Sequence, residues 1–246
     1  MMQIYSNNFT KTNVYKTNSF NSEIISQMIY GECFSVIESR SSWLKVKIKT
    51  DGYTGFIKKK KYTKYIKPTH KVYSLKANVY KNPSFKKKIM HLTYGSRVRL
   101  EEIKLGFIKF EKGWVEIKNL KHINFRNKNI FSQILIFKNV RYKWGCKSFD
   151  GVDCSALVQL CFNFNNKFCP RDTKDQIKYF KKNVDISSVK KNDVLFWKGH
   201  VAVAISKDKL IHAYGPKKKT IVMKIKKTID LIKRSANLKL ISVKRI

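Results

Sequence analysis

Two stretches of the amino-terminal half repeat each other, and this repeat limits the architecture of that half more than any other feature. Residues 13–20 (NVYKTNSF) recur as residues 78–85 (NVYKNPSF), and a Tyr-Gly pair at 30–31 recurs at 94–95. Each copy continues with short segments of alternating polar and apolar residues, separated by turn residues. A period of about 65 residues built from such segments predicts two copies of a small all-β barrel.

A spaced set of reactive residues marks the last third of the chain. Asp153, Cys154 and Ser155 precede an apolar segment with helical spacing, which places Cys154 in the first turn of a predicted helix. The dipole at a helix amino terminus favours the thiolate over the thiol. His200 and His212 belong to two apolar runs that predict neighbouring strands. A thiol, an imidazole and a group that orients the imidazole together indicate a cysteine hydrolase.

The turn between the two predicted strands determines whether the histidines can meet. Side chains alternate between the faces of a strand, so a shift of one residue in register moves all of them to the other face. A two-residue turn at Lys207 and Asp208 would place His200 and His212 on opposite faces. The hypothesis therefore requires a different loop length or a bulge.

The motifs of this region resemble those of the NlpC-type cell-wall peptidases, papain-like cysteine enzymes that cut peptidoglycan stem peptides after D-glutamate. The resemblance extends from about residue 129 to residue 246, and its motifs are residues 142–145 (YKWG), 153–155 (DCS), 170–173 (PRDT) with Gln176, 192–197 (NDVLFW) before Gly199 and His200, and 210–213 (LIHA). Three positions depart from the family pattern, because Cys146, Ala156 and Asn192 stand where the family usually has glycine.

The two copies of the repeat resemble bacterial SH3-type domains, which often precede NlpC-type domains. We therefore expect an α+β papain-like catalytic domain preceded by two small all-β SH3-like barrels. The expected boundaries are residues 1–67 and 68–122 for the SH3-type domains and residues 123–246 for the peptidase domain.

The resemblance implies roles for individual catalytic residues. Cys154 is then the nucleophile, His200 the general base and later the general acid, and His212 the group that orients His200. Tyr142 helps to hold the oxyanion. The implied reaction is hydrolysis of the bond between γ-D-glutamate and an L-diamino acid, through a thioester acyl-enzyme.

The resemblance also implies a substrate with a free amino terminus. Family members with paired SH3-type domains act as dipeptidyl-peptidases on murein peptide fragments that begin with a free L-alanine. Asp153 and Ser155, with Glu32 and Tyr53 from the first SH3-type domain, are implied to bind that ammonium group. Further candidates for substrate binding are Trp144, Arg171 and Thr173.

Two other functions use the same features and remain open. A papain-like amidase or acyltransferase would employ the same residues on another substrate, and an inactive SH3-type protein would only bind wall peptides.

We expect no cofactor and no metal, since no Cys-x-x-Cys or His-x-x-x-His pair occurs. The other cysteines and histidines are interpreted as structural or surface residues: Cys33, Cys161, Cys169, His70, His91 and His122.

The charge of the chain would ordinarily indicate a polyanionic partner. Its formal net charge is +37, yet only eight of the 53 basic residues are arginine. Because base readout usually uses arginine, we expect weak, salt-sensitive adhesion to polyanions and no specific nucleic-acid binding.

The location of the protein is an expectation from the same sequence. The first thirty residues lack an apolar signal segment, and no stretch is long enough to span a bilayer. We therefore expect a cytoplasmic enzyme that acts on recycled murein tripeptides and tetrapeptides, without membrane contact. The oligomeric state is left open.

Overall fold

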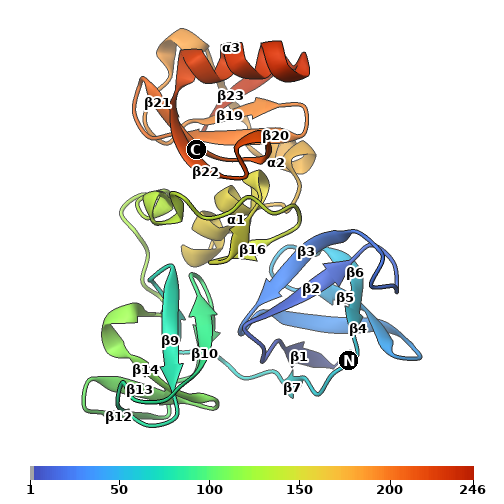
Figure 1. Cartoon of the computed structure of the whole chain (residues 1–246), viewed down its shortest axis with the longest axis vertical. Helices are drawn as coiled ribbons and strands as arrows, with labels where there is room; N and C mark the ends of the chain where they lie inside the picture. Colours follow the sequence, from blue (N-terminus) through green and yellow to red (C-terminus); the bar gives the residue numbers. More distant parts are fainter. Residues whose placement is uncertain (1–2) are drawn as a thin grey trace. The chain divides into compact units, whose positions relative to one another are not determined.

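The structure, a computed structural model, describes residues 3–246 and divides into two compact units (Figure 1). Unit 1 extends through Phe125 and also includes Gly145–Phe149, and unit 2 comprises Arg126–Trp144 and Asp150–Ile246. Residues 1 and 2, which begin the first predicted domain, lie outside the described residues. The predicted boundaries inside unit 1 stay a prediction.

The first copy of the repeat forms one antiparallel sheet of seven strands, in the order β3-β2-β6-β5-β4-β1-β7. The strands are β1 (Ile4–Ser6), β2 (Lys11–Tyr15), β3 (Ile24–Ile29), β4 (Cys33–Arg40), β5 (Trp43–Ile48), β6 (Thr54–Lys58) and β7 (Thr63–Lys64). Alternate residues of the strands point inward, as the period of two requires. Val14, Phe34, Val46 and Ile57 are fully buried and form the centre of this core.

The second copy forms two smaller sheets, β10-β9-β14-β13-β12 and β11-β8-β15. The elements are β8 (His70–Val72), β9 (Lys76–Tyr80), β10 (Lys88–Thr93), β11 (Arg97–Val98), β12 (Glu102–Lys104), β13 (Phe107–Phe110), β14 (Gly113–Glu116), the 3-10 helix η1 (Ile117–Asn119) and β15 (Leu120–His122). Its core is centred on Val72, Val79, Leu92 and Val115.

Equivalent contacts recur in the two copies. The Asn13 amide donates to the Tyr15 hydroxyl at 3.4 Å, and the Asn78 amide donates to the Tyr80 hydroxyl at 3.3 Å. The two tyrosine rings each meet a phenylalanine ring edge to face, Phe20 at 5.9 Å and Phe85 at 5.6 Å between ring centroids. The matched asparagine, tyrosine and phenylalanine residues thus make the same contacts in both copies.

Tyr30 joins the two copies within unit 1. Its ring packs into the core of the second copy, where it meets Phe110 edge to face at 5.6 Å. Its hydroxyl donates to a Glu111 carboxylate oxygen at 2.5 Å. The next residue, Gly31, has φ of +80°, and an added Cβ would lie 2.2 Å from the Arg97 carbonyl oxygen. Only glycine allows the two copies to approach this closely.

Unit 2 is an α+β arrangement around one antiparallel sheet, in the order β18-β23-β19-β20-β21-β22. Its elements are η2 (Ile134–Phe137), β17 (Gly151–Val152), α1 (Cys154–Phe164), α2 (Thr173–Tyr179), β18 (Lys182–Val184), η3 (Ile186–Ser188), β19 (Val194–Trp197), β20 (His200–Ala204), β21 (Lys209–Tyr214), η4 (Gly215–Lys217), β22 (Lys219–Lys224), α3 (Ile225–Ala236) and β23 (Ser242–Arg245). β16 (Lys147–Ser148) belongs to unit 1. Trp197, Leu210 and Ile232 anchor the core between the sheet and α3.

Helix α1 is buried along almost its whole length and contacts β20 and β21. Asp153 caps it, because one of its carboxylate oxygens accepts the Ala156 N–H at 2.8 Å. Such a cap stabilises a helix by about 1 kcal/mol. The helix begins at Cys154, as predicted, and β20 and β21 confirm the two predicted strands.

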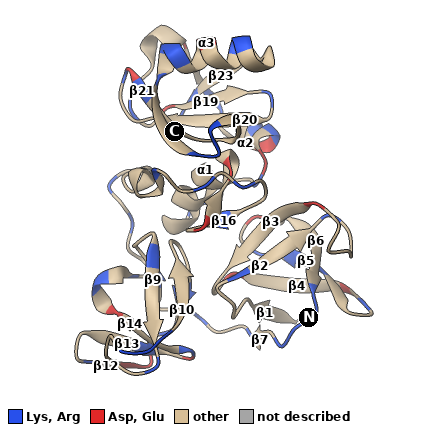
Figure 2. Cartoon of the chain, in the orientation of Figure 1, with Lys and Arg blue, Asp and Glu red and all other residues tan. Residues whose placement is uncertain are grey.

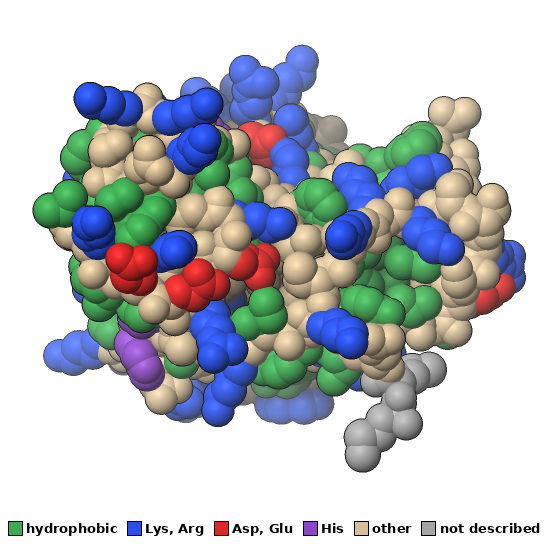
Figure 3. Space-filling view, turned by 90° about the horizontal axis from the view of Figure 1, so that it is seen from below, with side chains coloured by type: hydrophobic (Ala, Val, Ile, Leu, Met, Phe, Trp, Pro, Cys, Tyr) green, Lys and Arg blue, Asp and Glu red, His purple; other side chains and the backbone are tan. Residues whose placement is uncertain are grey.

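The basic side chains are spread over both units. Lysine and arginine occur on strands, helices and loops of each unit (Figure 2), and Figure 3 shows one face on which they are dispersed among apolar and polar atoms. No helix within residues 3–246 combines the length and the apolar character that crossing a membrane requires.

Candidate active site

Cys154 occupies the first position of α1 and is almost fully buried. Its sulfur lies 3.9 Å from the Gly199 carbonyl oxygen, which accepts the thiol proton at rest. The Val201 N–H also forms a hydrogen bond to the sulfur. The thiol therefore contacts the backbone on both sides of His200.

His200 and His212 form a hydrogen-bonded pair. The Nε2 of half-buried His200 lies 2.9 Å from the Nδ1 of fully buried His212. The His212 ring in turn stacks on the Tyr214 ring, with 4.7 Å between centroids and 10° between planes. This stacking fixes the plane of the His212 ring, which is what an orienting group needs.

The register of the hairpin explains why the two histidines meet. β20 pairs with β21 through Val203 opposite Ile211 and Ala204 opposite Leu210. The Ile205 N–H continues the ladder to the Lys209 carbonyl, so the loop contains residues 206–208 rather than two residues. Because the loop has three residues, the side chains of the two histidines lie on the same face of the sheet. A two-residue turn at Lys207 and Asp208 would have placed them on opposite faces.

The proton positions follow from the hydrogen bond between the rings. If Nε2 of His200 faces His212, Nδ1 remains to accept the thiol proton, so the neutral His200 ring must carry its own proton on Nε2. His212 then accepts at Nδ1 and carries its proton on Nε2. That Nε2 is buried and has no hydrogen-bond partner among residues 3–246.

Burial keeps the thiol and both imidazoles uncharged in the ligand-free site. Burial and the nearby Asp153 charge raise the pKa of Cys154 to about 11, although hydrogen bonds from the Val201 N–H and the Thr173 side chain oppose this shift. Burial lowers the pKa of His200 to about 4, and burial with the neighbouring His200 lowers that of His212 to about 3. The resting pair is therefore a thiol and a neutral imidazole.

Asp153 and Arg171 form a buried ion pair beside the nucleophile. One guanidinium nitrogen lies 2.5 Å from Oδ2 of Asp153, and the other lies 3.1 Å from Oδ1 and 2.8 Å from the Ser155 hydroxyl. The Ser155 hydroxyl donates to Oδ1 at 3.2 Å. Asp153, Ser155 and Arg171 are thus brought together, and their predicted contacts with substrate stay a prediction.

Three other predicted residues belong to the same unit as this centre. Burial of the ring is the main cause that raises the pKa of Tyr142, and negative charge at Cys154 or Asp153 adds to it, so its hydroxyl stays protonated and can donate to an oxyanion at neutral pH. Thr173 is buried at the start of α2, and its side chain bonds the Cys154 sulfur. Trp144 is exposed.

Glu32 and Tyr53 belong to unit 1, where Glu32 is buried. The two oxygens of its carboxylate accept the Ile29 N–H at 2.7 Å and the Lys147 ammonium at 2.8 Å. Tyr53 is half-buried, and its backbone N–H donates to the Asp51 side chain at 3.0 Å. The role of these two residues in binding a substrate ammonium stays a prediction.

The positions that depart from the family pattern fit their surroundings. Asn192 has φ of +77°, a conformation that asparagine tolerates better than most residues. Cys146 does not adopt positive φ, because the neighbouring Gly145 takes that conformation, with φ of +73°. Ala156 lies inside α1, where alanine is favoured.

Sequence reasoning assigned no role to two residues that support the site. Gln176 is fully buried and donates to the Ser155 and Pro170 carbonyls, each at 2.9 Å, so it fixes the chain beside the nucleophile. Its place in the quoted motif was a signal for such a role. Tyr214 lies two residues after His212 on the same strand face, which the period of two could have indicated.

The described residues form no group of three or more histidine, cysteine, aspartate or glutamate side chains placed to hold a metal ion.

Comparison with known proteins identifies the domains. Residues 139–230 match the NlpC/P60 family. The chain carries an NlpC/P60 domain. Residues 14–61 match the bacterial dipeptidyl-peptidase Sh3 domain, so an SH3-type domain precedes it. With Cys154, His200 and His212 in place, the NlpC/P60 domain is that of a cysteine peptidase.

Relatives and solved structures extend the similarity beyond the NlpC/P60 domain. The chain is 25% identical over 231 residues to dipeptidyl-peptidase 6 of Lysinibacillus sphaericus, covering 82% of this chain and 84% of that one. It is 26% identical to the γ-D-glutamyl-L-lysine dipeptidyl-peptidase of Bacillus subtilis, covering 84% and 77%. An NlpC/P60 family protein from Bacillus cereus shares the fold with a TM-score of 0.82 at 17% identity, covering 98% and 99%.

Proposed function

We propose that the protein is a dipeptidyl-peptidase that cleaves the γ-D-glutamyl bond to the L-diamino acid in murein tripeptides and tetrapeptides and releases L-Ala-D-Glu. The observation that carries this proposal is similarity to two dipeptidyl-peptidases over more than four fifths of the chain. That similarity includes the SH3-type domain as well as the peptidase domain.

The geometry of the site supplies a route for the reaction. The Cys154 proton moves to Nδ1 of His200 as sulfur attacks the γ-carbonyl carbon, and the Tyr142 hydroxyl donates to the oxyanion that forms. His200 passes the proton to the leaving amine, the C–N bond breaks and a thioester remains. Water then attacks the thioester and gives a proton to His200, which returns it to the departing Cys154 sulfur as the peptide carboxylate leaves.

The proposal also covers the amino-terminal half of the chain, which contains the first SH3-type domain and the second copy of the repeat. We propose that the second copy is also an SH3-type domain, since its sequence motif and its aromatic contacts repeat those of the first. Asp153 and Ser155 are proposed to select substrates with a free amino terminus. The same role for Glu32 and Tyr53 is the alternative that the Glu32→Gln experiment below decides.

We place the reaction in the cytoplasm, on recycled peptide fragments. All five cysteines, Cys33, Cys146, Cys154, Cys161 and Cys169, are free thiols, and four of them are buried. Free thiols and a thiol nucleophile are compatible with a reducing compartment.

Digestion of defined peptides tests the proposal. Incubation with L-Ala-γ-D-Glu-L-Lys and with its diaminopimelate counterpart, followed by mass spectrometry, is expected to show release of L-Ala-D-Glu. Cys154→Ser is expected to lose several orders of magnitude in kcat, because the thiolate carries the chemistry. Cys161→Ala is the matched control: this buried thiol lies within α1, and its removal leaves the nucleophile in place. Peptide binding without product would instead indicate an inactive binding protein.

One observation favours a second function, an endopeptidase on longer wall fragments. The two carboxylates proposed to bind the substrate ammonium, Asp153 and Glu32, are each paired with a basic side chain of this chain. A site whose carboxylates are already neutralised does not require a free amine on the substrate. Equal kcat/KM on free and amino-acetylated peptides would establish this second function.

A further inference from the structure

A five-residue segment within the stretch between Tyr142 and Cys154 folds with unit 1. The chain leaves unit 2 after Trp144 and re-enters it at Asp150, and Gly145–Phe149 in between belong to unit 1. We call residues 145–149 the strap. Tyr142 precedes the strap and Cys154 follows it shortly afterwards, so the strap is covalently joined to both functional residues.

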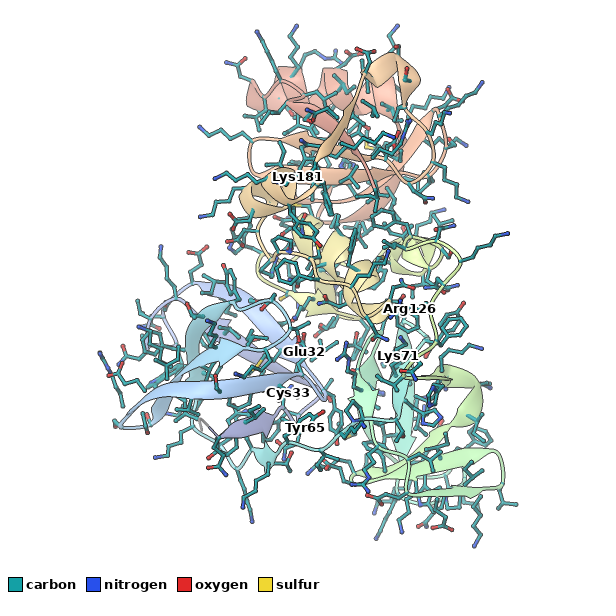
Figure 4. All side chains as sticks on the ribbon, turned by 180° about the vertical axis from the view of Figure 1, so that it is seen from behind. Glu32, Cys33, Tyr65, Lys71, Arg126 and Lys181 are labelled. Atoms are coloured by element: carbon teal, nitrogen blue, oxygen red, sulfur yellow. The ribbon has the colours of Figure 1, made fainter. Side chains whose placement is uncertain are left out.

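The strap is fixed at its centre by two side chains of the first repeat. β16 lies against β3, where the Lys147 N–H donates to the Gln27 side-chain oxygen at 3.0 Å. The Lys147 ammonium reaches the Glu32 carboxylate at 2.8 Å, with exposed fractions of 0% for Lys147 and 6% for Glu32. Glu32 directly precedes β4 and is labelled in Figure 4.

The ends of the strap are also held within unit 1. An added Cβ on Gly145 would lie 2.1 Å from the Ile24 carbonyl oxygen, so only glycine permits this approach. At the other end the Phe149 ring meets the His91 ring at 5.8 Å, and the Lys76 ammonium lies 4.9 Å from the Phe149 centroid.

A buried ion pair of this kind makes each partner depend on the other. Removing one partner leaves a charge without compensation in a place that water does not reach, which is far more unfavourable than losing an exposed pair. Glu32 and Lys147 lie 115 residues apart in the chain, so their contact ties the first repeat to the segment before the nucleophile.

We propose that Glu32 and Lys147 are positioning residues of the peptidase: their buried ion pair holds the strap, and the strap sets the placement of Tyr142 and Cys154. This inference rests on the proposed function for its substrate. It gives the Glu32 carboxylate a partner in the protein itself, the Lys147 ammonium, in place of the substrate ammonium. A shift of about 1 Å in a catalytic group can cost a factor of about 100 in rate, so a loosened strap reduces kcat.

The test compares Glu32→Gln, Lys147→Met and the double variant on L-Ala-γ-D-Glu-L-Lys and on its amino-acetylated form. Lys147→Met keeps most of the side-chain volume and removes the charge. Glu23→Gln is the matched control, because the Glu23–Lys16 pair lies in the same domain, at 3.8 Å, but is exposed. Thermal unfolding by circular dichroism accompanies each kinetic measurement.

The expected result is a tenfold or greater fall in kcat for both single variants, by the same factor on both peptides and with little change in KM. The double variant is expected to be no worse than the poorer single variant, because both changes remove one interaction. Glu23→Gln is expected to retain the original kcat. A loss by Glu32→Gln that is confined to the free-amine peptide, or an unchanged kcat for Lys147→Met, would overturn the proposal.

A measurement without substrate separates this proposal from the proposed function. The rate at which iodoacetamide alkylates Cys154, followed by mass spectrometry of the peptide that contains it, reports the placement of the thiol beside His200. If the unmodified protein cleaves neither peptide, the proposed function fails, while altered alkylation in Glu32→Gln and Lys147→Met still supports the strap. Unchanged alkylation in folded variants contradicts it.

Discussion

At the scale of single residues, the reactive groups of the site are uncharged at rest. The pKa of Cys154 is raised to about 11 and that of His200 is lowered to about 4, in both cases mainly by burial. A papain-like site that rests as an ion pair has the opposite shifts, with a lowered thiol pKa. Here the proton transfer to His200 must accompany attack on the carbonyl.

This resting state predicts the pH dependence of kcat/KM, which reports the free enzyme. Activity requires His200 unprotonated and the Cys154 proton present, so activity is lost in acid as His200 takes a proton and in alkali as the thiol ionises. We expect the acid limb well below the ordinary histidine pKa of ~6.5 and the alkaline limb above the ordinary thiol pKa of ~8.5. The measurement is kcat/KM from pH 4 to pH 11, a range of about seven units chosen to span both limbs.

The position of the alkaline limb is decisive for this prediction. If the resting pair were a thiolate and an imidazolium, the alkaline limb would report loss of the His200 proton and would lie at or below about pH 8.5. The Cys161→Ala protein serves as the reference, since its profile should coincide with that of the unmodified protein.

At the scale of elements, the amino terminus of α1 depends on one carboxylate with two duties. Asp153 caps the helix through the Ala156 N–H and compensates the buried Arg171 charge. Replacing it by alanine removes a cap of about 1 kcal/mol and leaves a buried guanidinium unpaired, at about 3 to 5 kcal/mol.

We therefore predict that Asp153→Ala lowers the free energy of unfolding by several kcal/mol, measured by urea denaturation. Adding Arg171→Met is expected to recover most of that loss, because the unpaired charge is then absent. A loss of under about 1 kcal/mol in the single variant would show that the pair contributes little to folding and would leave Asp153 available for substrate.

At the scale of the whole molecule, the two histidines of the site link stability to pH. Their pKa values in the folded protein, about 4 for His200 and about 3 for His212, lie below the ordinary value of ~6.5. Between these limits the unfolded chain binds more protons than the folded one, so stability is fully present above pH ~6.5 and falls as the pH is lowered.

We expect the free energy of unfolding of unit 2, measured by urea denaturation, to decrease steadily from pH 7 to pH 5. Each histidine contributes a slope of at most about 1.4 kcal/mol per pH unit. His212→Gln is expected to flatten this dependence, because glutamine does not titrate. The same slope in both proteins would mean that other groups control acid unfolding.

The patterns that are local in sequence determined the elements of this protein. Helical spacing after Cys154 and apolar runs at the two histidines correctly predicted α1, β20 and β21, because residue periodicity reports one buried face directly. The residues of the repeat make matching contacts at Tyr15 and Tyr80. Motif spacing also indicated the NlpC/P60 domain.

Only the tertiary structure decided how these elements meet. Hairpin register depends on a loop whose length the apolar pattern does not specify, so the contact between His200 and His212 could not be derived from sequence. The pKa shifts depend on burial and on neighbours brought in from elsewhere in the chain. The pairing of Lys147 with Glu32, 115 residues away, leaves no local signal, because a charge acquires its partner only when the chain is folded.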